Sequence, residues 1–194
     1  MYAKYEEHFN KIYKKSKVRF RTFPHHIEIV RYWAEKLCDK YPEADRDAVI
    51  IAALFHDLGH FTENLDEDDH AKISEKEARL FLKNEGASND VIKKATSAIR
   101  SHRNSDVSPK SIEDKIIVFA DSASHLTSPD VYLYVASGYG KSKALEKLER
   151  DYRDLALFPE EKKSLENLYS SWKNLIEVFP EEFYLFIRDI EKDN

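Results

Sequence analysis

The pair His56-Asp57 directly follows an apolar run of eight residues, Ala48 to Phe55. A carboxylate at the end of such a run is poorly placed, because burying an unpaired charge is costly. A bound metal ion would compensate that cost, and divalent transition metals accept imidazole nitrogen together with carboxylate oxygen. The pair therefore predicts a metal site at the end of this segment.

Four further residues along the chain are of the same chemical types. Asp121 follows another apolar stretch, so its carboxylate, like that of Asp57, would be costly to bury without a positively charged partner. His26 lies in the first turn of a predicted helix, and His70 and His102 lie near the ends of two others. One ion takes about four to six ligands, counting water. Four imidazoles and two carboxylates would suit two ions bridged by Asp57.

Helices are the elements that must position these side chains. Apolar residues recur at intervals of three and four in most of the chain, which is typical of amphipathic helices. Residues 46–58 are apolar on all sides in their middle, as expected of a helix surrounded by others, and we expect Gly59 to end that helix. The predicted helices span 2–16, 24–41, 46–58, 70–85, about 89–103 and 111 onwards, with more helix after Pro129, Pro159 and Pro180.

The helix starts carry recognisable capping residues. Asp45 is a suitable cap for the third helix, Ser88 or Asn89 for the fifth, and Ser111 with Asp114 for the sixth. Residues 62–69 are predicted to form an acidic loop. Residues 116–120 would also fit a short buried strand, but their flanks favour a helix. The predicted fold class is all-α, a compact multi-helix bundle, in keeping with only 4 Gly and 6 Pro in the chain.

The composition limits the classes of partner. The 194 residues fit one domain, and a formal net charge of −5 argues mildly against non-specific binding to nucleic acid or anionic membrane. The longest apolar run, at eight residues, is far too short to span a membrane. Cys38 is the single cysteine, which favours a reducing compartment. We expect a cytoplasmic protein with no membrane and no nucleic-acid partner.

Three segments resemble a known family. The residues His26 to Val30, the segment LFHDLGH at 54–60, and Asp121 within KIIVFADS at 115–122 are similar to the H…HD…D signature of the HD-domain superfamily. The resemblance covers about residues 20–125. It implies a single HD-type helical domain over 1–194, with an HD core at about 20–125 and a helical extension at about 128–194. It also implies a metal-dependent phosphohydrolase that acts on nucleotides or other phosphoesters.

Two further segments resemble the two-metal members of that superfamily. They are HAKISEKEA at 70–78, which begins with His70, and AIRSH at 98–102, which ends with His102. The bacterial HD-type dinucleoside tetraphosphate hydrolases carry this fuller pattern. It implies the metal ligands His26, His56, Asp57, His70, His102 and Asp121, of which Asp57 and His102 are the predicted catalytic residues.

The segment HDLGHF at 56–61 departs from some members of the superfamily. The 5′-deoxynucleotidases and the ppGpp hydrolases usually carry an acidic residue shortly after the HD pair, and this chain has Gly59, His60 and Phe61 there. Those two activities are therefore disfavoured, and the substrate stays open. His25 adjoins His26, and shifting the match to the family's pattern by one residue would put His25 in the place of His26. We prefer His26 because Val30 then matches the family's apolar position.

Positive charge is expected beside a phosphate. Arg103 follows His102 directly and Lys72 follows His70 by two residues, so both are predicted to bind substrate; Arg19 and Arg21 are further candidates. The ligand types favour one or two ions of Mn, Fe, Co, Ni or Zn, and Mg less.

The predicted function is hydrolysis of a small phosphoester, a nucleotide or dinucleotide, by metal-activated water. Two alternatives stay open: a di-iron oxygenase on the same scaffold, and a non-catalytic domain that senses nucleotides. Association of the chain with copies of itself also stays open. His60, four residues after His56, and His125, one helical turn beyond Asp121, are weaker candidates to line the site.

Overall fold

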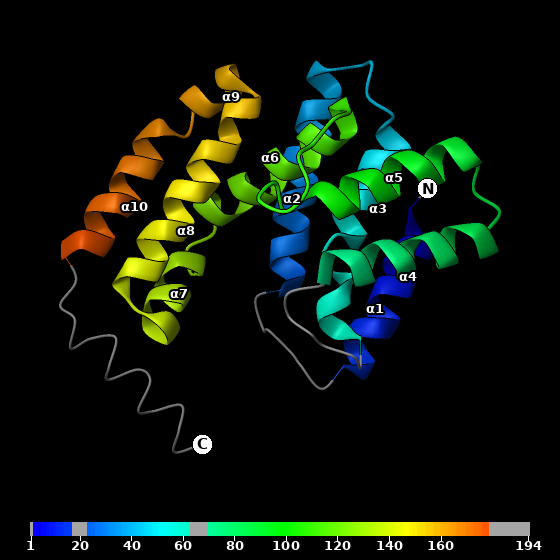
Figure 1. Ribbon diagram of the computed structural model, residues 1–194, viewed down its shortest axis with the longest axis horizontal. Coiled ribbons are helices and arrows are strands. Elements are labelled where there is room, and N and C mark those ends of the chain that lie inside the picture. The colour runs from blue at the N-terminus through cyan, green and yellow to red at the C-terminus, as the bar shows by residue number, and fades with distance from the viewer. Residues whose placement is uncertain (1, 17–22, 63–69, 179–194) are drawn as a thin grey trace. The chain divides into compact units, whose positions relative to one another are not determined.

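The computed structural model describes residues 2–16, 23–62 and 70–178, and within them it contains helices and no strand (Figure 1). This confirms the predicted all-α fold class. No helix in these ranges has the length and apolar character needed to cross a membrane. Arg19 and Arg21, the predicted loop at 63–69 and the predicted helix after Pro180 lie outside the described residues.

The chain divides into two compact units, residues 1–121 and 122–194. The single domain predicted from the sequence stays a prediction. The first unit contains α1 (Ala3–Lys15), α2 (Phe23–Lys40), α3 (Arg46–Phe55), the 3₁₀ helix η1 (Leu58–Phe61), α4 (His70–Asn84), α5 (Asn89–Ser101) and most of α6 (Ile112–Thr127). The second contains the end of α6 followed by α7 (Val131–Tyr139), α8 (Lys141–Asp154), the 3₁₀ helix η3 (Leu155–Leu157), α9 (Pro159–Lys163) and α10 (Glu166–Val178).

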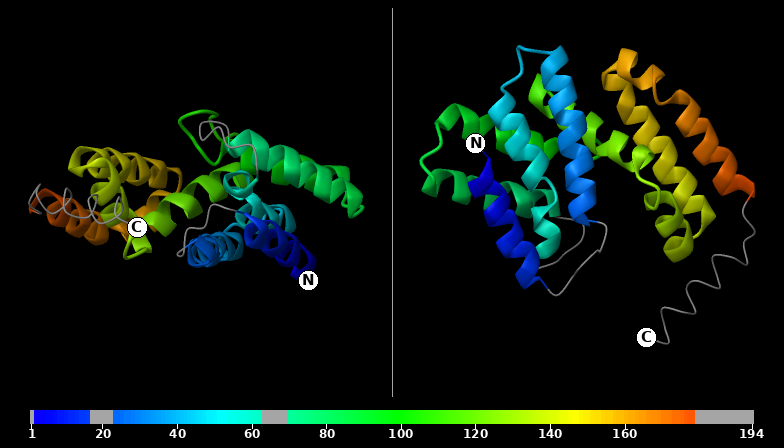
Figure 2. Two further views of the ribbon diagram at one scale, coloured as in Figure 1. Left: turned by 90° about the horizontal axis from the view of Figure 1, so that it is seen from below. Right: turned by 180° about the vertical axis from the view of Figure 1, so that it is seen from behind.

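Helix α3 forms the centre of the first unit. Each of its residues from Ala48 to Phe55 is at most 4% exposed, which explains why this helix is apolar all round. It packs against α2 and α5, and α4 lies alongside α5 (Figures 1 and 2). Trp33 of α2 contacts Phe119 of α6 edge to face. These contacts fix the ends of several helices around one buried helix.

Side-chain caps set the starts of three helices, as predicted. Oδ1 of Asp45 accepts a hydrogen bond from the backbone N of Ala48 at 3.2 Å, and Oγ of Ser88 accepts one from the backbone N of Val91 at 3.2 Å. At the start of α6, Oγ of Ser111 accepts from the backbone N of Asp114, while Oδ2 of Asp114 accepts from the backbone N of Ser111. This reciprocal pair is a capping box.

One predicted helix end is wrong. The helix expected over 46–58 ends at Phe55, and Gly59 lies inside η1 rather than after a helix. The φ of Gly59 is not positive, so its role is not that of a left-handed stop. A Cβ at Gly59 would lie 2.3 Å from the carbonyl oxygen of His70, so glycine is needed where η1 meets the start of α4. The backbone N of Gly59 also donates to Oγ of Ser74 at 2.8 Å.

The second unit is built around a buried polar contact between α7 and α8. The hydroxyl of Tyr132 donates to Oδ2 of Asp151 at 3.0 Å, and that oxygen lies 3.1 Å from both Lys147 Nζ and His125 Nδ1. Burial opposes the charged form of Asp151, but Lys147 and His125 outweigh it and lower its pKa. Nε1 of Trp172 donates to the carbonyl oxygen of Leu126 at 2.8 Å, which ties α10 to this unit.

Candidate metal centre

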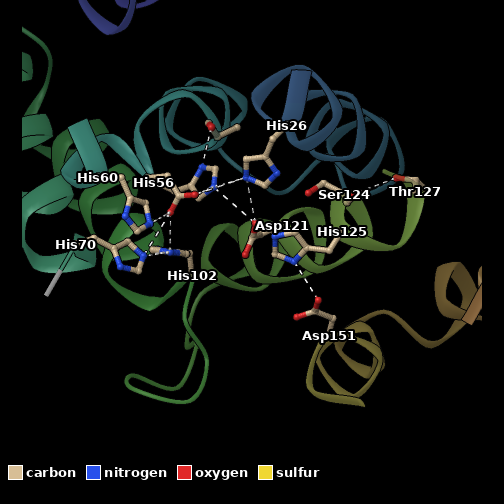
Figure 3. A network of polar contacts seen from close by, with 12 residues as sticks. His26, His56, His60, His70, His102, Asp121, Ser124, His125, Thr127 and Asp151 are labelled. Atoms are coloured by element: carbon tan, nitrogen blue, oxygen red, sulfur yellow. Dashed lines mark hydrogen bonds and ion pairs between the residues drawn. The ribbon is translucent and has the colours of Figure 1, made fainter. Parts of the chain in front are cut away.

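Six predicted side chains gather within the first unit, from the ends or the middle of five helices (Figure 3). The gathering follows from the helix packing, because four of the five helices contribute residues at or next to an end. His26 lies near the start of α2, His56 and Asp57 directly follow α3, His70 begins α4, His102 directly follows α5, and Asp121 lies in α6.

One group of side chains is formed by His26, His56 and Asp57. The Nε2 atoms of the two histidines lie 3.2 Å apart, and Oδ2 of Asp57 lies 3.4 Å from Nε2 of His56 and 3.7 Å from that of His26. Oδ1 of Asp121 approaches the same two nitrogens, at 3.5 Å from His26 and 3.7 Å from His56. Three nitrogen and oxygen atoms of this group lie within 4.8 Å of one another, so they could hold one metal ion.

The second group is formed by His70, His102 and the same Asp57. The Nε2 atoms of His70 and His102 lie 3.2 Å apart. Oδ1 of Asp57 lies 3.4 Å from the first and 3.3 Å from the second. These three ligand atoms also lie within 4.8 Å of one another. Asp57 thus offers one carboxylate oxygen to each group.

Two histidines are oriented by the backbone of the helices they follow. Nδ1 of His56 lies 3.0 Å from the carbonyl oxygen of Ala53, and Nδ1 of His102 lies 2.7 Å from that of Ile99. A carbonyl can only accept, so Nδ1 carries the proton and donates in both cases. In the neutral imidazole the lone pair is then on Nε2, which points into the cluster. This is the usual arrangement of a metal-binding histidine.

The charges of the cluster are strongly coupled. Burial disfavours the carboxylate of Asp57, but His56, His102 and His70 outweigh burial and hold its pKa well below the ordinary value. Burial likewise disfavours the imidazolium of His56, but Asp57 and Asp121 raise its pKa well above the ordinary value. The buried carboxylates therefore require positive charge beside them, which can be a proton on an imidazole or a metal ion.

The donor set fits divalent transition metal ions. Imidazole nitrogens and carboxylate oxygens lie within 4.8 Å of one another in each group, and the nitrogen lone pairs of His56 and His102 are directed inward. His56 is fully buried and His102 is 4% exposed, so bulk water has little access to these nitrogens. Two groups that share Asp57 match the arrangement predicted for two bridged ions.

One predicted substrate-binding cation lies on helix α4, and the other lies just after the end of α5. Arg103 follows His102, is partly buried, and pairs with Asp106 at 3.3 Å. Lys72 is on α4, two residues and therefore about 200° of helical turn from His70. Their roles stay predictions. His25 is exposed and faces Glu28, whereas His26 faces the cluster, in agreement with the preference for His26.

One further histidine lies at the edge of the cluster. His60 lies in η1, with its ring stacked on that of His70 at a centroid distance of 4.0 Å (Figure 3). The expected helix end at Gly59 concealed this placement. A 3₁₀ turn that begins directly after Asp57 returns the chain toward α4, which periodicity did not indicate. His125 contacts Asp151 and Lys147 within the second unit, and its predicted place beside the site stays a prediction.

Comparison with known proteins gives one match. A family model described as HD domain matches residues 24–125, which is more than half of the chain and includes His26, His56, Asp57, His70, His102 and Asp121. No curated protein and no solved structure matches the chain.

Proposed function

The chain belongs to the HD domain family, and we propose that it is a hydrolase that cleaves a phosphoester bond of a nucleotide or dinucleotide with the help of two divalent metal ions. The observation that carries this proposal is the pair of ligand groups joined by Asp57. Two metal ions held side by side are suited to clamp the attacking and the leaving oxygen of a phosphoryl group. Membership of the HD domain family implies metal-dependent phosphohydrolase chemistry, which agrees with this proposal.

Each ligand is assigned to an ion by its distances. His26, His56, Asp57 and Asp121 would hold the first ion, and Asp57, His70 and His102 would hold the second. The nitrogen and oxygen donors favour Mn, Fe, Co, Ni or Zn. When bound, such ions supply an activated water at neutral pH and positive charge for the phosphate oxygens.

The protein's own side chains prepare this site in three ways. The carboxylate of Asp57 is kept ionised by the histidines around it, so it is ready to bridge. His56 and His102 have their inward nitrogens fixed by backbone carbonyls, which reduces the reorganisation needed on binding. Burial of these residues excludes bulk water, which strengthens each charge interaction inside the site.

Substrate is expected to be held by nearby cations. Arg103 is adjacent to His102, and its planar guanidinium can form paired hydrogen bonds with a phosphate. Its present partner is Asp106, so binding a phosphate would exchange one anion for another. Lys72 is the second proposed contact, acting as a single positive charge from α4.

The test combines metal analysis with a substrate screen. The purified protein would be treated with a chelator, reloaded separately with Mn, Fe, Co, Ni and Zn, and assayed against nucleotides and dinucleotides. We expect about two ions per chain, loss of activity on chelation, and return of activity on reloading. Asp57→Ala is the inactive control, because it removes the shared ligand.

Two results would favour the alternative functions. A loaded protein that cleaves no phosphoester but shows an iron-dependent optical signal under oxygen would indicate a di-iron oxygenase. A loaded protein that binds nucleotides and converts none would indicate a sensing domain. Activity that survives in Asp57→Ala would refute the two-ion mechanism.

A further inference from the structure

We propose that His8 is a pH-sensitive switch: helix α1 is docked on the first unit while the His8 imidazole is neutral, and is released when that imidazole is protonated. Docking of α1 would thus be strongest near neutral pH and weaker in mild acid. The support is the place of the ring in the helix contact, one nitrogen atom without a partner, and the charges around it. The proposed metal ligands take no part, so this inference stands apart from the proposed function.

Aromatic rings form much of the contact between α1 and the rest of the first unit. The helix packs against η1 and α3 (Figure 1). The ring of Tyr5 lies edge to face on Phe55 and Phe81, at centroid distances of 6.3 and 6.1 Å. Further along the helix, Tyr13 lies edge to face on Phe61 at 5.0 Å. An isolated helix of 13 residues is only marginally stable in water, so α1 depends on these contacts.

His8 lies inside this aromatic contact. Its ring stacks on that of Phe81 of α4, with centroids 3.7 Å apart and an interplanar angle of 18°. The ring of Phe55, from α3, lies 5.8 Å away. Among the described residues, Nε2 of His8 is a buried atom with no hydrogen-bond partner. The residue as a whole is only partly buried, so a proton from solvent can reach the ring.

The neutral ring fits this place better than the protonated ring. A neutral imidazole can carry its proton on Nδ1 and leave Nε2 as an acceptor, whereas an imidazolium has an N–H at both nitrogens. The N–H at Nε2 of His8 would then be a charged donor buried without an acceptor, which is costly. The face of Phe81 attracts a cation, but stacking supplies no acceptor in the plane of the imidazole, where its N–H bonds point.

The charges around His8 come from α1 and α4. Burial of the ring lowers the pKa of His8 below its ordinary value, and the ammonium of Lys11 on α1 acts in the same direction. The carboxylates of Glu77 and Glu85 on α4 oppose this shift without cancelling it. Glu85 is already paired with Lys4 at 3.2 Å. Helix α3 is apolar along its buried length and adds no charge beside the ring.

The lowered pKa sets the direction of the switch. In a detached α1 the imidazole would be in water, where its pKa is about 6.5. The detached state then binds the proton more readily than the docked state. Docking therefore weakens as the pH falls below about 6.5, and the change ends below the lower pKa of the docked state. Release would remove from η1 the ring contacts that Phe9 and Tyr13 make with Phe61.

Hydrogen exchange of the α1 backbone amides, followed by mass spectrometry at about pH 7.5 and about pH 5.5, tests the switch. Protection is corrected for the pH dependence of intrinsic exchange, and the carboxylates stay ionised because they ordinarily titrate near about pH 4.3. In the wild type we expect the protection of α1 to fall several-fold in acid. The fall should not exceed about 10-fold, because the lower pH is about one unit below the ordinary histidine pKa.

Two variants show whether His8 is the group responsible. His8→Phe keeps an aromatic ring between Phe81 and Phe55 but cannot titrate, so the protection of α1 should be the same at both pH values. His25→Phe is the matched control, because it removes an exposed histidine of α2 that faces only Glu28 in its own helix. This control should lose protection of α1 in acid as the wild type does.

A second measurement, on the wild-type protein, follows the proton itself. An NMR titration of the His8 ring signals, assigned by their absence from His8→Gln, should give a pKa below about 6.5. A pKa at or above that value would overturn the inference, since the docked state would then bind the proton at least as well as the detached one. Equal protection of wild-type α1 at both pH values would also overturn it, as would an undiminished loss of protection in His8→Phe.

Discussion

Oδ1 of Asp57 lies 3.3 Å from Nε2 of His102. The second oxygen of the same carboxylate faces His56 at 3.4 Å, so Asp57 joins two groups of histidines that are otherwise contributed by different helices. A substitution of Asp57 therefore tests both proposed metal sites at once.

Asp57→Asn is expected to lose both metal ions. The amide has nearly the shape of the carboxylate but no charge, and it is a much weaker ligand than a carboxylate. Elemental analysis of the purified variant should show far less than one ion per chain, and activity should fall at least about 100-fold. Asp90→Asn, an exposed carboxylate on α5, is the matched control and should keep wild-type metal content. A fully loaded Asp57→Asn would contradict the shared ligand.

His102→Ala and Asp121→Asn are expected to lose different ions. His102 belongs to the group with His70, whereas Asp121 faces His26 and His56. Each variant should keep about one ion per chain, because the other group is left with its own ligands. Metal titration followed by elemental analysis would check this stoichiometry. If either variant lost all metal, the two groups would not be separate sites.

Gly59→Ala is expected to destabilise the protein and weaken the site. The added Cβ would lie 2.3 Å from the carbonyl oxygen of His70, so η1 or the start of α4 must move. Such crowding typically costs about 1–3 kcal/mol of unfolding free energy. The measurement is thermal unfolding together with metal content.

Gly138→Ala is the control for that substitution. Nothing lies within 4 Å of a Cβ at Gly138, which is in helix α7 with an ordinary φ. Alanine there should be neutral or stabilising by up to about 1 kcal/mol, because it restricts the unfolded chain. Equal effects of the two substitutions would show that the contact between η1 and α4 tolerates a methyl group.

Asp151→Asn is expected to reduce the pH dependence of stability in the second unit. The pKa of Asp151 is lowered in the folded protein, so its contribution is fully present above the unfolded carboxyl pKa of about 3.9. That contribution is lost as the pH falls through the lower folded pKa. The asparagine variant should be less stable than wild type by about 1.5–3 kcal/mol at pH 7, and the difference should shrink below about pH 4.

The two tryptophans allow this measurement within one unit. Trp33 lies in the first unit and Trp172 in the second, and the chain has no other. In a Trp33→Phe background, fluorescence reports Trp172, which packs against Tyr132 at a centroid distance of 5.4 Å. Urea unfolding followed at pH 7 and pH 3 would give both free energies. A difference in unfolding free energy between this background and its Asp151→Asn variant that stays constant with pH would contradict the assigned role.

Local chemistry made much of the fold predictable. Asp45, Ser88 and Ser111 each accept the hydrogen bond expected of a helix cap, because capping depends on residues only three positions apart. The burial of α3 on all sides followed from its apolar sequence. The gathering of His26, His56, Asp57, His70, His102 and Asp121 was expected because buried carboxylates need positive charge, and the structure brings these residues together.

Features that depend on packing between distant segments could not be predicted. The sequence predicted that Gly59 ends a helix. Its lack of a side chain instead allows η1 to pack closely against His70, and nothing in the sequence near Gly59 indicates that contact. The stacking of His60 on His70 depends on the same approach. The contact of Asp151 with Tyr132 joins α7 to α8 and required knowledge of how those helices pair.

The division between the two compact units falls inside α6, directly after Asp121, and not in a linker. A shortened chain that stopped at this division would place a proposed metal ligand on the last residue of a frayed helix end, where backbone hydrogen bonds are missing. Anyone dissecting this protein should therefore cut beyond Thr127, so that the remaining turn of α6 still supports the carboxylate.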